Sequence, residues 1–181
     1  AYAFKYLWSP LIDNYQLPFF KKFGHRKSWL FLSQLLIIIA LILTAFTDPQ
    51  NNLFFTALFI SLLAFFSATQ DILIDAFRIE SAPQSQQGPL SSMYIAGYRV
   101  AMLIAGAGSL WLAAFFGTET YNQDVWGKVY LIMSIFMLIG VFTTVYSEEP
   151  KIKKKINKDN HVKFFLTILF AVLGFIFLYS I

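Results

Sequence analysis

Four long apolar runs constrain this chain more than any other feature of its sequence. They cover residues 29–46, 53–77, 90–116 and 125–146. A helix needs about 20 mostly apolar residues to cross a hydrocarbon layer about 30 Å thick, and each run is close to that length. Residues 1–13 resemble the second half of another such helix, and residues 164–181 a helix of minimal length. We therefore expect an all-α, polytopic bundle of transmembrane helices.

Composition supports a lipid bilayer as the surroundings of the chain. Of its 181 residues 57% are hydrophobic and only 13% are charged, which is more apolar surface than a soluble domain of this length can bury. The net charge of +4 comes from basic residues in two loops, so it does not indicate a nucleic-acid partner. Because cysteine is absent, no disulfide or thiolate metal site can form.

The sequence does not indicate an enzyme. It contains none of the HExxH, GxSxG, P-loop or GxGxxG motifs. Asp71 and Asp75 lie four residues apart on one expected helix, where their side chains run parallel and do not share a proton as a protease dyad must. We expect neither catalytic residues nor a bound cofactor or metal.

The loops predict the topology. Residues 14–28 and 147–163 hold most of the lysines and arginines, residues 78–89 are near neutral, and residues 47–52 have no basic side chain. Cytoplasmic loops are enriched in Lys and Arg, so we expect 14–28, 78–89 and 147–163 on the cytoplasmic side. The basic linker 147–163 would separate a first bundle, residues 1–146, from the first helix of a second bundle, residues 164–181. Since the chain begins inside an apolar segment, we interpret it as a fragment.

Ionisable residues interrupt two of the apolar runs. By helical rise Asp71 lies about 10 Å deeper than Arg78, and Arg99 about 13 Å below the start of its own run. We expect Asp71 and Arg99 at similar depth, facing a water-filled passage, because ionised groups inside a membrane commonly mark transport pathways. A purely structural ion pair between them is the alternative. Asp75 is expected to pair with Arg78 at i+3.

Four segments carry a family resemblance. They are KYLWSPLIDNY at 5–15, FGHRKSWLFLSQ at 23–34, SATQDILIDAFRIE at 67–80 and GYRVAMLIAGAGSLWLA at 97–113. In order and spacing they resemble the AmpG muropeptide permeases of the major facilitator superfamily. The resemblance implies a fold of two helical halves, of which the chain would hold most of the N-terminal half and the start of the C-terminal half. Acetyl-CoA transporters share two of the elements and are the alternative family.

The resemblance also implies a cytoplasmic gate. The motif of the superfamily between its second and third helices maps onto Asp13, Gly24, Arg26 and Lys27. Such motifs latch the gate through ion pairs with neighbouring helix ends. The nearby candidates for these partners are Asp75, Arg78 and Glu80. His25 stands where the family often has arginine, which puts one gate contact in question.

An AmpG-type protein would import an N-acetylglucosaminyl-anhydro-N-acetylmuramyl peptide across the bacterial inner membrane, driven by proton symport and without a cofactor. Arg99 could bind peptide carboxylates, and Asp71 could carry the proton. The expected partners of the sugar and amide groups are Trp8, Gln34, Gln70, Tyr94 and Tyr98. The remainder of the transporter would be needed for activity, and a non-transporting product of a split or decayed gene is a further alternative.

Overall fold

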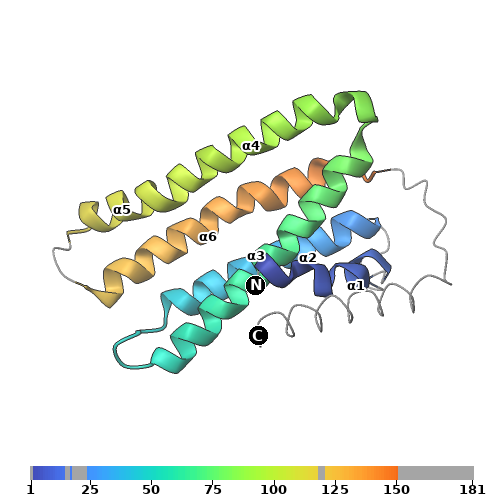
Figure 1. Ribbon diagram of the computed structural model, residues 1–181. Coiled ribbons are helices and arrows are strands. Elements are labelled where there is room, and N and C mark those ends of the chain that lie inside the picture. The colour runs from blue at the N-terminus through green and yellow to red at the C-terminus, as the bar shows by residue number, and fades with distance from the viewer. Residues whose placement is uncertain (1, 15–16, 18–23, 118–120, 151–181) are drawn as a thin grey trace, which may run out of the picture.

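The computed structural model describes residues 2–14, 17, 24–117 and 121–150, and these residues are helical with short connections (Figure 1). The elements in chain order are η1 (Tyr2–Leu7), α1 (Ser9–Asn14), α2 (His25–Ala45), α3 (Leu53–Ser81), η3 (Gln84–Gln86), α4 (Gln87–Leu103), η4 (Ile104–Gly108), α5 (Ser109–Phe115) and α6 (Gln123–Tyr146). The described part contains no strand. The expected all-α class is confirmed.

Four helical stretches are long and apolar enough to cross a membrane: His25–Ala45, Leu53–Ser81, Gln84–Phe115 and Gln123–Tyr146. Each contains or closely overlaps one of the four predicted runs. Charged residues extend two helices beyond the apolar sequence, so that α2 begins at His25 rather than at residue 29 and α3 continues to Ser81 rather than ending at residue 77. The expected helix at 164–181 and most of the linker 147–163 lie outside the described residues.

The helix boundaries follow local sequence signals. α3 ends before Pro83, where Ala82 is extended, because a residue that precedes proline disfavours the helical conformation. α6 begins at an Asn122 cap, whose side chain accepts a hydrogen bond from the backbone N–H of Asp124 at 2.9 Å. The Gln84–Phe115 stretch contains the π-helical segment η4, which separates α4 from α5.

Loops expected on the same side of the membrane gather at the same end of the bundle. At one end Arg26 bonds with Glu80, and the backbone of Arg26 donates to Glu149. At the opposite end Tyr121 donates to Asp48 at 3.1 Å, and Gln123 donates to the carbonyl of Ala45 at 3.1 Å. The predicted alternation of loops therefore appears in the fold.

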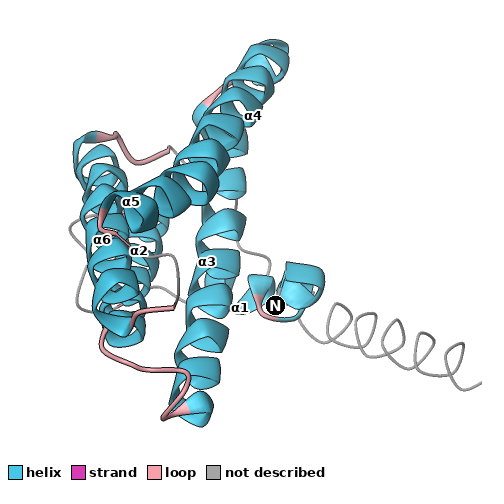
Figure 2. Cartoon of the chain, turned by 90° about the vertical axis from the view of Figure 1, so that its left-hand side faces the viewer, coloured by secondary structure: helices cyan, strands magenta, loops and turns pink. Residues whose placement is uncertain are grey.

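α2 lies along α6 and also packs against α3, while α4 has few contacts with α3 and α5 packs against α6 (Figures 1 and 2). The α2–α6 contact is built on small residues. Gly127 of α6 lies so close to α2 that an added Cβ would be 2.8 Å from the carbonyl oxygen of Ala45. Small residues let helix backbones approach closely in membranes, where burying apolar side chains brings little gain.

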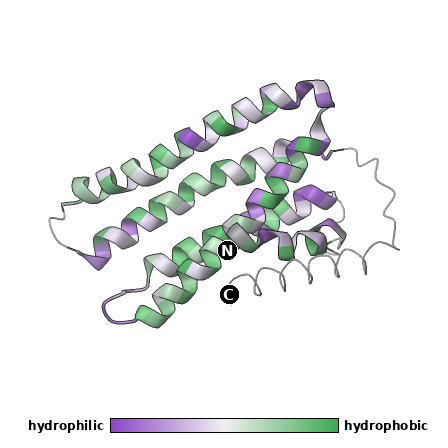
Figure 3. Ribbon diagram, viewed as in Figure 1, coloured by the Kyte–Doolittle hydropathy of each residue, from purple (hydrophilic) through white to green (hydrophobic). Residues whose placement is uncertain are grey.

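Polar and apolar side chains are distributed as in a membrane protein. Two small apolar clusters are buried, one around Ile12, Leu30 and Leu73, the other around Ala113, Val125 and Val129. Large apolar side chains cover the outside of the helices, and hydrophilic segments gather at the helix ends (Figure 3). A surface of this kind suits lipid tails rather than water.

Candidate functional site

An ionic network joins η1 to α3, and we call Lys5, Asp71, Asp75 and Arg78 the charge cluster. Lys5 Nζ lies 2.6 Å from Asp71 Oδ2 and 3.9 Å from Asp75 Oδ2. Arg78 pairs with Asp75 across one turn of α3, with Nη2 3.2 Å from Oδ1. The predicted Asp75–Arg78 pair is thus present. The two cations and two carboxylates leave the cluster with no net formal charge.

α4 completes this network with uncharged groups. The Tyr94 hydroxyl donates to Asp71 Oδ1 at 2.8 Å, so both carboxylate oxygens of Asp71 have a partner. Arg78 donates to the hydroxyl of Ser91, and its guanidinium lies 5.2 Å from the centre of the Tyr94 ring. Asp71 is thereby held between three elements, η1, α3 and α4.

The expected proximity of Asp71 and Arg99 does not lead to an ion pair. Asp71 bonds with Lys5 and Tyr94 instead, and the described part of the chain offers Arg99 no hydrogen bond or ion pair; its side chain is exposed. The reason is geometric. α4 meets α3 near its own N-terminal half, and five residues beyond Tyr94 the helix has turned by about 140°, so Arg99 projects from a different face.

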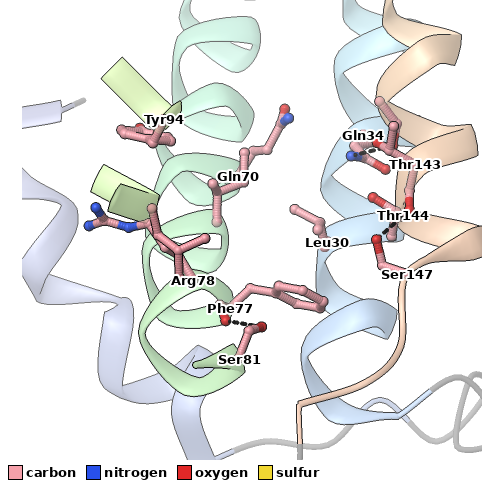
Figure 4. Close-up of a pocket in the computed structure, with 13 residues that line it drawn as sticks. Leu30, Gln34, Gln70, Phe77, Arg78, Ser81, Tyr94, Thr143, Thr144 and Ser147 are labelled. Atoms are coloured by element: carbon pink, nitrogen blue, oxygen red, sulfur yellow. Dashed lines mark hydrogen bonds between the residues drawn. The ribbon is translucent and has the colours of Figure 1, made fainter. Parts of the chain in front are cut away.

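A cavity of about 430 Å³ lies between α2, α3, α4 and α6 (Figure 4). Its wall contains three of the predicted polar residues, Gln34, Gln70 and Tyr94, as well as Arg78. Gln34 is only 2% exposed and donates from Nε2 to the carbonyl of Gly140 at 3.1 Å. Gln34 Oε1 and Arg78 Nε are buried without a hydrogen-bond partner among the described residues. In this arrangement both atoms are closed off from the cavity.

Two other predicted binding residues lie elsewhere. Trp8 donates from its indole N–H to the hydroxyl of Thr69 at 3.1 Å and packs against Phe65. The polar group of Trp8 is therefore already bonded within the bundle. Tyr98 is 60% exposed on α4 and does not line the cavity. The structure therefore brings together only part of the predicted set. The described residues hold no group of three His, Asp or Glu side chains that could bind a metal ion.

The residues of the predicted gate motif meet at the end of the bundle where α2 begins. Arg26 forms a two-point contact with Glu80, with Nε 2.9 Å and Nη2 2.6 Å from the carboxylate oxygens, and its Nη1 bonds with Asp13. The Arg26 side chain is 8% exposed. Glu80 is thus a partner of the motif, whereas Arg78 and Asp75 belong to the charge cluster.

A second contact holds the same end together. The Glu149 carboxylate, which follows α6, accepts hydrogen bonds from the backbone N–H groups of Arg26 at 2.8 Å and Lys27 at 3.0 Å. Lys27 Nζ in turn donates to the carbonyls of Val145 and Ser147 at the end of α6. Each helix end therefore satisfies backbone groups of the other. His25 contributes nothing comparable, since its Nε2 is buried without a described partner.

Sequence reasoning missed Lys5 and Glu149. Lys5 precedes Asp13 of the gate motif by eight residues, and Asp71 precedes Glu80 by nine. A depth estimate from the gate end could therefore have placed Lys5 at the level of Asp71. Glu149 lies in the SEEP segment, and a carboxylate next to a helix end is a recognised cap, but the helix it caps is distant in sequence. Only the fold shows which helix end receives it.

Comparison with known proteins gives a consistent family. Residues 1–181 match the sequence model described as Major Facilitator Superfamily. A relative named putative transporter AmpG 4, from Rickettsia conorii, is 37% identical over 158 residues, covering 87% of this chain and 37% of the relative. The anhydromuropeptide permease of Escherichia coli K12 is 35% identical over 151 residues, covering 83% of this chain and 28% of the permease. No solved structure gives a significant match.

The resemblance to AmpG-type proteins is confirmed by these relatives. The chain spans little more than a third of the length of the Rickettsia relative. Four helices of membrane-spanning length and a match over every residue lead to one conclusion. The chain belongs to the major facilitator superfamily.

Proposed function

We propose that this chain forms part of a secondary transporter that imports anhydromuropeptides across the bacterial cytoplasmic membrane together with protons. The observation that carries the proposal is the pairing of Asp71 with Lys5 inside a chain related to an anhydromuropeptide permease. Ionised groups within membrane helices are costly and are kept where they serve a pathway or a proton relay.

The substrate class fits the polar groups that the fold collects. An anhydromuropeptide carries two amino sugars and a peptide, and therefore offers hydroxyl groups, amides and carboxylates. Gln34, Gln70, Tyr94 and Arg78 bring amide, hydroxyl and guanidinium groups to the residues that line the cavity. Binding sites for small molecules combine an apolar wall with a few such polar groups.

Asp71 is the proton carrier in this proposal. The Asp71 side chain is 25% exposed in the described part of the chain, and its partners Lys5 and Tyr94 come from different elements. Movement of one element against another would change these contacts and with them the proton affinity of Asp71. Rocking of the two helical halves about a central site, the usual motion of such transporters, would also switch the access of water to Asp71 from one side of the membrane to the other. Arg99 stays a predicted contact of the peptide carboxylates.

The test is uptake of labelled N-acetylglucosaminyl-anhydro-N-acetylmuramyl peptide into right-side-out membrane vesicles. The host would lack its own muropeptide permease and would express the gene that encodes this chain. We expect uptake that rises when the outside is made acidic and collapses with a protonophore. Asp71→Asn should abolish the gradient-driven part, whereas Asp124→Asn, a change at an exposed carboxylate near the opposite end of the bundle, should leave it intact.

Two results would count against the proposal. Gradient-independent accumulation of the peptide would remove proton symport, and absence of uptake by well-inserted protein would remove muropeptide transport. Uptake of labelled acetyl-CoA, with no uptake of muropeptide, would favour the acetyl-CoA-type carriers instead. Insertion is checked by detecting a C-terminal tag in the membrane fraction, so that poor expression is not read as lack of transport.

A further inference from the structure

The charge cluster contains a cation that the sequence did not point to. Lys5 comes from η1 and reaches Asp71 on α3 at 2.6 Å, while its second carboxylate, Asp75, is at 3.9 Å. Asp75 is already paired with Arg78 at 3.2 Å. The shortest ion pair of Lys5 in the cluster is therefore the one with Asp71. A proton on Asp71 would neutralise the carboxylate and end that ion pair.

We propose that Lys5 is the residue that binds a carboxylate of the substrate, and that a proton on Asp71 removes the carboxylate that competes with the substrate for Lys5. The inference rests on the proposed function and names the contact through which proton and substrate are coupled. A neutral Asp71 leaves the cluster with one positive charge in excess, and a carboxylate from the substrate restores neutrality. No bond is made or broken apart from the transfer of one proton to Asp71 from the acidic side of the membrane.

The electrostatics make the two binding events support each other. In a membrane interior a net charge is poorly solvated, so the cluster favours states in which its charges cancel. Ionised Asp71 competes with the substrate carboxylate for Lys5, whereas protonated Asp71 does not. A proton therefore raises the affinity for the anion, and by linkage the anion raises the affinity for the proton.

The surroundings of Asp71 contain the parts that such an exchange needs. η1 contributes Lys5, α3 contributes Asp75 and Arg78, and α4 contributes the neutral hydroxyl of Tyr94, which can stay bonded to Asp71 in either protonation state. The Lys5 side chain is 37% exposed, so the described residues leave part of it uncovered. Tyr94 and Arg78 also line the cavity, which places the cluster beside the space proposed for the sugar.

The experiment compares two substrates that differ only in charge: the muropeptide, and the same molecule with its peptide carboxylates amidated. Uptake into vesicles is measured for the wild type, Lys5→Met, Lys5→Arg and Arg99→Met. For the charged substrate we expect Lys5→Met to raise KM by on the order of tenfold, the effect of one charge-assisted hydrogen bond, with a smaller change in the maximal rate. For the amidated substrate KM should hardly change, and Lys5→Arg should retain most of the affinity for the charged one.

Lys128→Met is the matched control, because it removes an exposed lysine on α6 that is remote from the cluster in sequence and element. It should transport both substrates as the wild type does. A merely structural role of Lys5 would change the uptake of both substrates by the same factor, and that result would overturn the inference. So would a charge-dependent KM effect in Arg99→Met that is missing in Lys5→Met.

The failure of this inference can be told apart from the failure of the proposed function. If the wild type takes up the muropeptide and Lys5→Met does not distinguish the two substrates, only the role of Lys5 is lost. If the wild type, inserted in the membrane, takes up neither substrate, the proposed function falls and the inference with it. A selective loss of the charged substrate in Lys5→Met supports both.

Discussion

The carboxylate of Glu149 lies directly over the backbone of Gly24, where a Cβ would be 2.6 Å from Glu149 Oε2. Gly24 has φ +92°, a conformation that favours glycine, and it offers no side chain that could cap the helix beginning at His25. Glu149 takes over that task from the end of α6. Glycine at this position thus admits both the backbone turn and the distant cap.

Gly24→Ala is expected to destabilise the protein by roughly 2 kcal/mol, since it strains the backbone and displaces the carboxylate. Thermal unfolding in detergent measures the change. Gly88→Ala is the control, because Gly88 is helical and has open space around it, so alanine should be neutral or slightly stabilising. The two effects share one partner, hence Gly24→Ala combined with Glu149→Ala should cost less than the sum of the single changes. Additive costs would show that the contact does not matter.

Glu149→Gln should lower stability by about 1 kcal/mol, the usual contribution of a helix cap, because an amide keeps one acceptor but loses the charge that complements the start of α2. Glu148→Gln removes the same charge from the neighbouring, exposed carboxylate and should change stability little. Denaturant unfolding of both variants at the same ionic strength separates the cap from a general charge effect. Equal effects of the two substitutions would contradict the assignment of Glu149 as the cap.

The sequence predicted the helices better than their arrangement. Apolar length alone located the four spans, because a bilayer sets how many residues a helix needs, and loop charge predicted which helix ends lie together. Small residues predicted less about how the helices pack. A stripe of small residues recurs at every fourth position, at Gly97, Ala101, Ala105, Ser109 and Ala113. Gly97 and Ala101 lie exposed on α4, and only Ala113 packs into a described core. A stripe indicates that a helix can be approached closely, but not by which neighbour.

The site was predicted in part for a similar reason. The Arg26–Glu80 contact followed from the family motif, and the Asp75–Arg78 pair from helical spacing, because both rest on local or motif information. The partner of Asp71 did not. Depth along a helix gives the level of a residue but not its direction across the bundle, so the sequence placed Arg99 at the level of Asp71 but could not show that Lys5 is the partner. The roles of these residues in transport stay predictions.

Gly127→Ala should disturb the contact between α2 and α6. The added Cβ would lie 2.8 Å from the carbonyl oxygen of Ala45, a backbone atom that cannot move without shifting α2. Overpacking of this kind costs about 1–3 kcal/mol. Gly97→Ala, with open space at its position, should not have this cost. Comparing the unfolding temperatures of the two variants in one detergent checks the prediction. Equal values would show that α2 and α6 can shift apart enough to accept the added methyl group without loss of stability.

Arg26→Lys should loosen the predicted gate even though it keeps the charge. Arg26 binds both oxygens of Glu80 and also reaches Asp13, and a lysine cannot reproduce this planar, two-point geometry. Because the chain has no cysteine, a single Thr144→Cys reports on access to the cavity, where Thr144 is buried. We expect Arg26→Lys to speed the reaction of this thiol with a polar maleimide added to inside-out vesicles several-fold.

The gate prediction has two internal checks. Glu80→Gln should speed labelling as Arg26→Lys does, and the two together should do little more than either alone, since both break one contact. Arg99→Lys makes the same exchange at an exposed position and should leave the labelling rate unchanged. Breaking a buried ion pair by removing one partner can cost about 3–5 kcal/mol, so each variant is first shown to be folded and inserted. Labelling at the wild-type rate in folded Arg26→Lys would mean that this contact does not close the cytoplasmic end.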